Sequence, residues 1–368
     1  MDTKKPATLS KRAAPFRPYT LVMFLLIAFL ILIVSCTRCS FGSMRNPKQI
    51  NILSYNTENL FDDIDNGTEY PEYDPGAGEW DSDAYYVKMM NIAQVIRASC
   101  ENGPDIVALQ EIENDNVLED LKENFLAGMG YRETVIPEAE NSAVQCAFIS
   151  KYPVSRLKTH ALSVNGYERN RFILEAGFLI GGRELIIFNN HWKSKSGGAE
   201  ETEEQRIEAA GIIRRRLFEL AEKDSRKDAL VLGDLNENAD EYIRIEKQYQ
   251  TALLPMDMSF QTAYFRRSLA ITSVREKACI DGDQVVLYSP WGELPGEGSY
   301  IYGGLWETID HALLPPALFD DSGFTFESFT VIKEDFMLTD RGFPFRWNSE
   351  NRSGYSDHFP ILVTLTAE

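Results

Sequence analysis

The chain has 368 residues, of which 44% are hydrophobic and 25% charged, as in ordinary globular proteins, and its formal net charge is −19. So acidic a balance argues against a broad phosphate-binding surface, which would collect Lys and Arg, but it allows a small site with a few local cations. Of the five cysteines, two lie in the N-terminal segment, and the other three are far apart, lack metal-binding spacing and are too few for a disulfide scaffold.

The N-terminal segment has the pattern of an export signal. Basic residues precede the uninterrupted apolar run from Leu21 to Val34, which is shorter than the about 20 residues that a spanning helix needs. The tripeptide before Cys36, Ile-Val-Ser, resembles the bacterial lipobox, in which the cysteine is lipidated after cleavage. The alternative is an uncleaved helix from Tyr19 to about Thr37. In either case we expect the protein to be extracytoplasmic and anchored to a membrane, because the basic flank stays in the cytoplasm.

The remainder of the chain divides into a short tether and one domain. Residues 1–36 form the signal or anchor, and residues 37–48, with Ser, Gly, Asn and Pro, are expected to be the tether. Residues 49–368 are expected to form a single domain.

Strand and helix patterns then alternate irregularly along the chain. Residues 62–81, rich in Asp, Gly, Pro and Tyr, are typical of a long loop. Helical periodicity is found over 83–99, 115–127 and 203–222. Strand patterns are found over 50–56, 105–110, 144–149, 172–180, 184–190, 229–232, 283–288, 309–314 and 361–366. Because helices and strands mix without strict alternation, the pattern favours an α/β or α+β sandwich over a regular doubly wound sheet.

Several predicted strands end or begin with acids and amides. They are Asn56, Glu111, Asp234 with Asn236, Asp310, and Asp357 with His358. Any one of them has an ordinary structural explanation, but five strand ends of the same chemical kind predict one rim where oxygen atoms bind a hard cation.

Histidine adds candidates for proton transfer, since imidazole titrates near neutral pH. His191 follows an apolar strand within Asn-Asn-His-Trp-Lys-Ser-Lys-Ser-Gly-Gly, and His358 follows Asp357. His160 has no such neighbourhood and is predicted to lie at the surface, whereas His311 is predicted to be structural.

These motifs resemble those of the endonuclease/exonuclease/phosphatase superfamily in order and spacing. The resemblance rests on Asn56 in SYNTENLFD, Glu111 in DIVALQE, GDLNE, TIDHALL and YSDHFP, and it covers about residues 50–365. The segments NHWKSKSGG and GSYIYGGLWETIDH are similar to a bacterial branch of extracellular nucleases. The resemblance implies a four-layer αββα sandwich of two mixed β-sheets flanked by helices.

The same resemblance implies roles for single residues. Glu111, Asn56 and Asp357 would bind Mg²⁺ or Mn²⁺. Asp234 would activate water, Asn236 would donate to phosphate, and His358 would act as a donor paired with Asp310. His191 would hold or protonate a further oxygen. Either arginine of Glu-Arg-Asn-Arg-Phe could bind the substrate phosphate, and we favour Arg171 over Arg169, with Lys193 as a weaker candidate.

The function expected is therefore hydrolysis of phosphodiester bonds by a metal-dependent enzyme, with nucleic acid as the favoured substrate and no protein partner predicted. A sphingomyelin or phospholipid phosphodiesterase, an inositol- or sugar-phosphate phosphatase, and a non-catalytic binding protein are the alternatives. An exposed aromatic hairpin around Tyr300, Tyr302 and Trp306 would favour lipid. A groove lined by Arg171, Lys193, Lys195, Arg266 and Arg267 would favour nucleic acid. Arg214, Arg215 and Arg216 are expected to lie on a solvated face of the helix over 203–222.

Overall fold

A computed structural model describes residues 48–78, 80–137, 142–164, 166–256, 266–281 and 284–367 of the chain. The body from Pro47 onward is one compact unit. The predicted signal segment and most of the predicted tether lie outside the described residues. Within the ranges given above, no helix is long and apolar enough to cross a membrane.

Two mixed β-sheets form the centre of the body, as expected from the sequence. The first has the strand order β16-β17-β1-β2-β4-β3, and β1 and β2 are parallel while the other neighbours are antiparallel. Its strands are β1 (Lys48–Leu60), β2 (Ile106–Ile112), β3 (Glu133–Val135), β4 (Gln145–Ser150), β16 (Phe324–Val331) and β17 (Ile361–Ala367).

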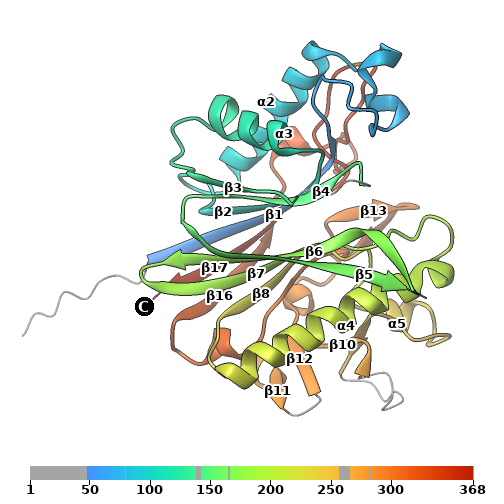
Figure 1. The fold of residues 1–368 in the computed structure, drawn as a ribbon. Helices are drawn as coiled ribbons and strands as arrows, with labels where there is room; N and C mark the ends of the chain where they lie inside the picture. The colour runs from blue at the N-terminus through green and yellow to red at the C-terminus, as the bar shows by residue number, and fades with distance from the viewer. Residues whose placement is uncertain are drawn as a thin grey trace, which may run out of the picture. The chain divides into compact units, whose positions relative to one another are not determined.

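The second central sheet has the order β15-β8-β7-β6-β5, with β7 and β8 parallel. Its strands are β5 (Val154–Val164), β6 (Tyr167–Ile180), β7 (Arg183–His191), β8 (Ala229–Asp234) and β15 (Asp310–Leu313). An apolar cluster that includes Ile52, Phe148, Phe178 and Leu232 fills the space between the two sheets. Figure 1 shows the two sheets as adjacent layers.

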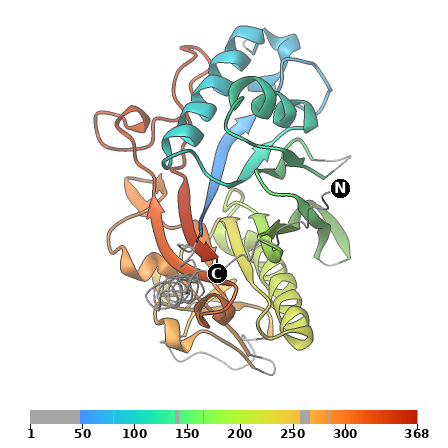
Figure 2. The same ribbon diagram turned by 90° about the vertical axis from the view of Figure 1, so that its left-hand side faces the viewer.

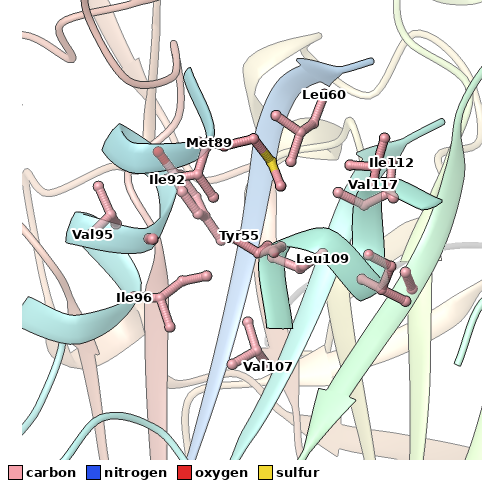
Figure 3. Close-up of a cluster of buried hydrophobic side chains, with 14 of the residues drawn as sticks. Tyr55, Leu60, Met89, Ile92, Val95, Ile96, Val107, Leu109, Ile112 and Val117 are labelled. Carbon is pink, nitrogen blue, oxygen red and sulfur yellow. The ribbon is translucent and has the colours of Figure 1, made fainter. Parts of the chain in front are cut away.

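Helices cover the outer face of the first sheet. They are α2 (Ser82–Ala98), α3 (Asp115–Asp120) and the π-helical turn η3 (Leu121–Phe125). The Asp81 carboxylate caps α2 by accepting from the Ala84 N–H at 2.9 Å, and Asn114 caps α3 in the same way. Figure 3 shows Met89, Ile92 and Ile96 of α2 packed toward Tyr55 and Leu109 of the sheet.

The outer face of the second sheet has two kinds of cover. The long helix α4 (Ala199–Lys223) packs on it, as the periodicity predicts. A small sheet of order β11-β12-β10-β9 shares the same apolar cluster, and of its strands the sequence predicted only the one over 283–288. Its strands are β9 (Leu253–Pro255), β10 (Leu269–Thr272), β11 (Cys279–Asp281) and β12 (Gln284–Tyr288). Figure 2 shows α2 and α3 at the top and α4 below, on opposite sides of the central strands.

The αββα layering is thus confirmed, with a strand layer added beside α4. A hairpin of β13 (Tyr300–Tyr302) and β14 (Leu305–Glu307) and the short helix α5 (Glu241–Arg244) complete the regular structure, along with several single 3₁₀ turns. These turns are η1 (Pro71–Tyr73), η2 (Pro75–Ala77), η5 (Arg275–Lys277), η6 (Pro290–Glu293), η7 (Pro316–Phe319) and η8 (Asp335–Met337).

Buried amides join the two central sheets beneath the site. The Gln110 amide donates to the Asn189 side-chain oxygen at 2.6 Å, and Asn189 donates to the carbonyls of Leu109 and Ala147 at 2.9 Å each. Gln110 and Asn189 are fully buried, so unpaired amides there would carry a desolvation penalty. These bonds therefore hold the two sheets together close to the site, because Gln110 directly precedes Glu111 and Asn189 lies two residues before His191.

Candidate active site

Three of the predicted residues are direct neighbours across the second sheet. The register pairs His191 of β7 with Asp234 of β8, and Asp234 with Asp310 of β15. Gly233 makes this approach possible, because a Cβ there would lie 2.1 Å from the Asn190 carbonyl oxygen. The strand ends predicted from the sequence therefore do converge in this sheet.

Two further predicted residues reach the same place from the first sheet. The pairing of β1 with β2 shifts between Asn56 and Leu60, and Glu111 lies opposite this irregularity with φ of 65°. The Asn56 amide nitrogen donates to Glu111 Oε1 at 3.2 Å and to Asp234 Oδ2 at 3.1 Å. Asn56 therefore bridges the carboxylates of the two sheets.

His358 is held in place by Asp310. Its Nδ1 lies 2.8 Å from Asp310 Oδ2, which also accepts from Ser299 Oγ at 2.6 Å. Burial opposes the imidazolium charge, but the charge of Asp310 and its hydrogen bond outweigh this and raise the pKa of His358 well above its ordinary value. The Tyr300 ring lies over the imidazole, with 4.7 Å between centroids.

Asp234 lies at the centre of the group. Its Oδ1 accepts from the Asn236 N–H at 2.8 Å, and its Oδ2 accepts from the side-chain amides of Asn56 and Asn236 at 3.1 Å each. Burial raises the pKa of Asp234 to about 7, and the nearby charges of Asp310 and Glu111 add to the rise while His358 opposes it. Asp234 is therefore oriented by several donors and poised to exchange a proton near neutral pH.

His191 stands on the other side of Asp234. Its Nε2 is 3.4 Å from Glu111 Oε1 and 3.7 Å from Asp234 Oδ2. Burial, followed by the positive charges of Arg171 and His358, lowers the pKa of His191 well below its ordinary value. The two site histidines therefore differ in protonation, since His191 is neutral where His358 carries a charge.

A polar cavity of about 740 Å³ opens over these side chains. Glu111, Arg171, His191, Asp234, Asn236, Asp357 and His358 all line it. Asn56 and Asp310 are bonded to lining residues from below. Lys193 is not among the lining residues, and its carbonyl accepts from the buried Arg206 at 3.0 Å.

Comparison with known proteins decides the family. Residues 51–252 match the profile of the Endonuclease/Exonuclease/phosphatase family. The chain belongs to this family. The match spans more than half of the protein and includes Asn56, Glu111, His191, Asp234 and Asn236.

Solved structures of the family share the fold at low sequence identity. An endonuclease/exonuclease/phosphatase family protein from Bacteroides thetaiotaomicron is 17% identical with a TM-score of 0.51, covering 88% of this chain and 99% of that one. TDP2 from Caenorhabditis elegans is 15% identical with a TM-score of 0.52, covering 87% and 75%. The mannosyl-6-phosphatase Bt3783 from B. thetaiotaomicron is 16% identical with a TM-score of 0.50, covering 86% and 99%. No curated protein sequence matches the chain.

Members of the endonuclease/exonuclease/phosphatase family are phosphoester hydrolases that generally use divalent metal ions. The residues here fit such an ion. In the described ranges no three His, Cys, Asp or Glu side chains form a metal cage, but Mg²⁺ keeps several waters and needs only one or two carboxylates. Glu111 and Asp357, whose side chains are 16% and 27% exposed, offer hard oxygen atoms to the cavity. Asn56 lies beside Glu111, with its amide nitrogen toward that carboxylate.

The sequence missed several other residues that line the cavity, namely Glu58, Asn59, Glu72, Tyr73, Glu307 and Arg346. Lys195, Tyr300 and Tyr302, which the sequence offered as candidates for a groove and an exposed hairpin, also line it. No sequence signal existed for the contact of Glu58 with Arg346, because the two are 288 residues apart.

Two predictions about residues outside the cavity need correction. His160 is not a surface residue: its side chain is 11% exposed, and Nε2 lies 2.8 Å from Oε2 of the buried Glu175. Arg216 is not on a solvated helix face, since its guanidinium donates to both oxygens of Glu175 at 2.8 and 2.9 Å. His311 is structural, as predicted, with Nε2 2.8 Å from the Glu237 carbonyl.

Proposed function

We propose that this chain is a Mg²⁺- or Mn²⁺-dependent phosphodiesterase that acts on nucleic acid. The observation that carries the proposal is that Asp234, a protonated His358 and a neutral His191 meet beside Glu111 in one cavity. A base and a proton donor on either side of one position are what in-line displacement at phosphorus requires.

Each side chain has a role that its surroundings support. Asp234, with a pKa of about 7, accepts the proton of the attacking water. His358, kept charged by Asp310, donates to a phosphoryl oxygen as its negative charge grows. Asn236 would donate to the same group, and to do so its amide must exchange its bond to Trp192 O or to Asp234. The bound metal would polarise the phosphoryl group and stabilise its charge.

Two features at the cavity support a nucleic-acid substrate. Arg171 donates to the uncharged Trp192 carbonyl and so keeps its positive charge for phosphate. Tyr302, at 70% exposure, offers a ring on which a base can stack. The wider groove considered above is not supported, because Arg266 and Arg267 do not line the cavity and Arg267 pairs with Glu204. The proposal is therefore for contact with a short stretch of strand.

A second candidate is a phospholipid phosphodiesterase. The hairpin of β13 and β14 exposes Leu305 as well as Tyr302, at 69% and 70%, beside the cavity. Such an apolar tip would suit a membrane surface. Trp306 does not contribute, because it packs on Phe343 and Phe359. The low similarity to a mannosyl-6-phosphatase makes sugar phosphates a third substrate to assay.

One assay decides between these candidates. Purified full-length protein is incubated with plasmid DNA, RNA, sphingomyelin, inositol phosphates and mannose 6-phosphate, each with Mg²⁺, with Mn²⁺ and with excess EDTA. We expect metal-dependent cleavage of nucleic acid. Cleavage of sphingomyelin alone would replace the first proposal with the second, and full activity in EDTA would refute metal dependence.

We also propose that the enzyme is extracytoplasmic and lipid-anchored through Cys36, on the evidence of the N-terminal sequence alone. Cys36→Ala should then abolish incorporation of labelled palmitate in bacterial cells, while Cys39→Ala should not. Labelling that survives Cys36→Ala would point to another modified residue, and an absence of labelling in the wild type would favour the uncleaved helix.

A further inference from the structure

Arg346 is a cation at the cavity to which the roles proposed above give no task. It lies between η8 and β17 and lines the cavity, and its side chain is 68% exposed. Its Nε and Nη2 both donate to Glu58 Oε1, at 2.9 and 2.6 Å. A guanidinium has five N–H donors, so three remain for another acceptor. Glu58 therefore orients Arg346 and leaves three of its N–H groups for another acceptor.

The support under Arg346 is an unusual set of buried charges. Glu58 is 6% exposed, adopts φ of 51°, and accepts from the Trp347 N–H at 2.8 Å through its second oxygen. Lys88 is fully buried, donates to the Glu58 carbonyl, and has its Nζ 5.3 Å from the ring centres of Tyr73 and Trp347. Burial lowers the pKa of Lys88 to about 8, which leaves it mostly charged at pH 7. The Glu58 residue thus has two cations beside it, the buried Lys88 and the exposed Arg346.

Arg346 and Arg171 reach the cavity from different halves of the fold. Arg346 rests on Glu58 in β1 of the first sheet, whereas Arg171 belongs to β6 of the second sheet and bonds to Trp192 just after His191. The third lining cation, Lys195, is 2.6 Å from Glu241 and is neutralised by it. Besides the imidazolium of His358, the cavity therefore offers two separate positive positions, Arg171 beside His191 and Arg346 against Glu58.

The rest of the lining restricts where a second anion could sit. Glu58, Glu72, Glu111, Asp234, Glu307 and Asp357 all line the cavity, so an anionic group would be repelled over most of its surface. Arg346 offers a fixed, exposed guanidinium within this acidic lining, and its planar array of donors suits a phosphate.

We infer that Arg346 forms a second anion subsite, which binds a phosphate adjacent to the one being hydrolysed. The inference rests on the proposed phosphodiesterase function and narrows its substrate to esters that carry two neighbouring phosphates, as a nucleic-acid strand or a 5′-phosphorylated nucleotide ester does. Arg171 then holds the phosphoryl group at His191, and Arg346 sets the register of the substrate by binding its neighbouring phosphate.

The test uses two chromogenic esters that differ by one phosphate. They are the 4-nitrophenyl ester of thymidine 3′-phosphate and the same compound with an additional 5′-phosphate. The full-length enzyme and its Arg346→Ala and Arg346→Lys variants are assayed with Mg²⁺, and the quantity compared is the ratio of kcat/KM on the two esters. In the wild type we expect the doubly phosphorylated ester to be preferred.

Arg346→Ala should lower this ratio by about 10- to 100-fold, the usual effect of a lost charge-assisted contact, and mainly through KM. Arg346→Lys should lower it less, since the charge remains. The matched control is Arg352→Ala, which removes an arginine of the same loop that pairs with Asp81 and Asp83 and does not line the cavity. Its ratio should equal that of the wild type.

The outcomes separate the two hypotheses. An unchanged ratio in Arg346→Ala, or an equal loss on both esters, would overturn the second subsite while leaving the phosphodiesterase in place. Hydrolysis of neither ester by the wild type would overturn the proposed function and the subsite with it. Thermal unfolding checks each variant, and if Arg346→Ala does not fold, Arg346→Lys and Arg346→Gln decide by the same ratio.

Discussion

Replacing Asp310 with Asn tests the pairing on which the proposed proton-donor role of His358 depends. Asp310 is 2% exposed, and its Oδ2 accepts from His358 Nδ1 at 2.8 Å and from Ser299 Oγ at 2.6 Å. The substitution keeps the shape of the side chain but removes the negative charge. His358 then loses its main reason to stay protonated in a buried position.

The expected magnitude follows from the kind of bond that is lost. A hydrogen bond to a charged partner contributes about 1.5–3 kcal/mol, and each 1.36 kcal/mol corresponds to a factor of ten in rate. We therefore expect kcat to fall by about 10- to 150-fold. The loss should fall on kcat more than on KM, because His358 meets the greatest charge in the transition state.

The assay measures kcat and KM at saturating Mg²⁺ on whichever phosphodiester the wild type cleaves. Ser299→Ala is the matched control, since it removes the other bond to Asp310 Oδ2 and leaves the charge. A neutral hydrogen bond contributes about 0.5–1.5 kcal/mol, so this variant should lose about 10-fold or less. A kcat of Asp310→Asn within twofold of the wild type, or a larger loss in Ser299→Ala, would refute the pairing as a catalytic device.

Three further predictions concern other parts of the structure. Asp234→Asn should reduce kcat by about 100-fold or more and leave the affinity for metal nearly intact. The activity of Glu111→Gln should instead be partly rescued by extra Mg²⁺. If extra Mg²⁺ rescues only Asp234→Asn, the metal ligand and the base are assigned the wrong way round. Burial opposes the charge of Glu175, but the bonds of this carboxylate to His160 and Arg216 lower its pKa to about 2. The charged carboxylate therefore contributes about 3 kcal/mol to the free energy of unfolding. This contribution is present above the ordinary pKa of 4.5 and is lost as the pH falls from there toward 2. Urea unfolding at pH 7 and pH 3 should therefore show a gap between the wild type and Glu175→Gln that shrinks with acid, and a constant gap would contradict this. Gly233→Ala should destabilise far more than Gly78→Ala in thermal unfolding, because both have positive φ but only Gly233 has a neighbouring backbone within reach of a Cβ.

The sequence predicted those parts of the fold that lie in the centre of the sheets. The strands that bear Asn56, Glu111, His191 and Asp234 are buried on both faces and therefore form continuous apolar runs. The polar residues that interrupt these runs mark the rim of the site. Their convergence follows from strand direction, and so it could be anticipated without coordinates.

The strands that the sequence missed lie mostly at sheet edges. β3, β5 and β16 end their sheets, and β5 and β16 have half-exposed side chains with no apolar run. Missing β5 also explains the error over His160, whose partner Glu175 lies on the neighbouring strand β6. Because the strand around His160 was not predicted, nothing in the sequence indicated that its side chain faces a neighbouring strand. The predicted helix over 115–127 begins at Asp115 as expected but ends at Phe125, and its second half is a π-helical turn.

The contact of Glu58 with Arg346 illustrates what no local pattern could reveal. Glu58, Asn59 and Glu111 adopt φ of 51°, 61° and 65° where the pairing of β1 with β2 breaks, and such backbones cost about 1–3 kcal/mol each. They are kept in place by specific bonds: Glu111 Oε2 accepts from the Asn59 N–H at 2.9 Å, and Glu58 accepts from Trp347 and Arg346. A regular ladder would alternate these side chains between the two faces of the sheet. Breaking it lets Glu58, Asn59 and Glu111 all line one cavity, so this irregularity in the pairing of β1 with β2 joins the proposed metal ligand Glu111 to the proposed second anion subsite.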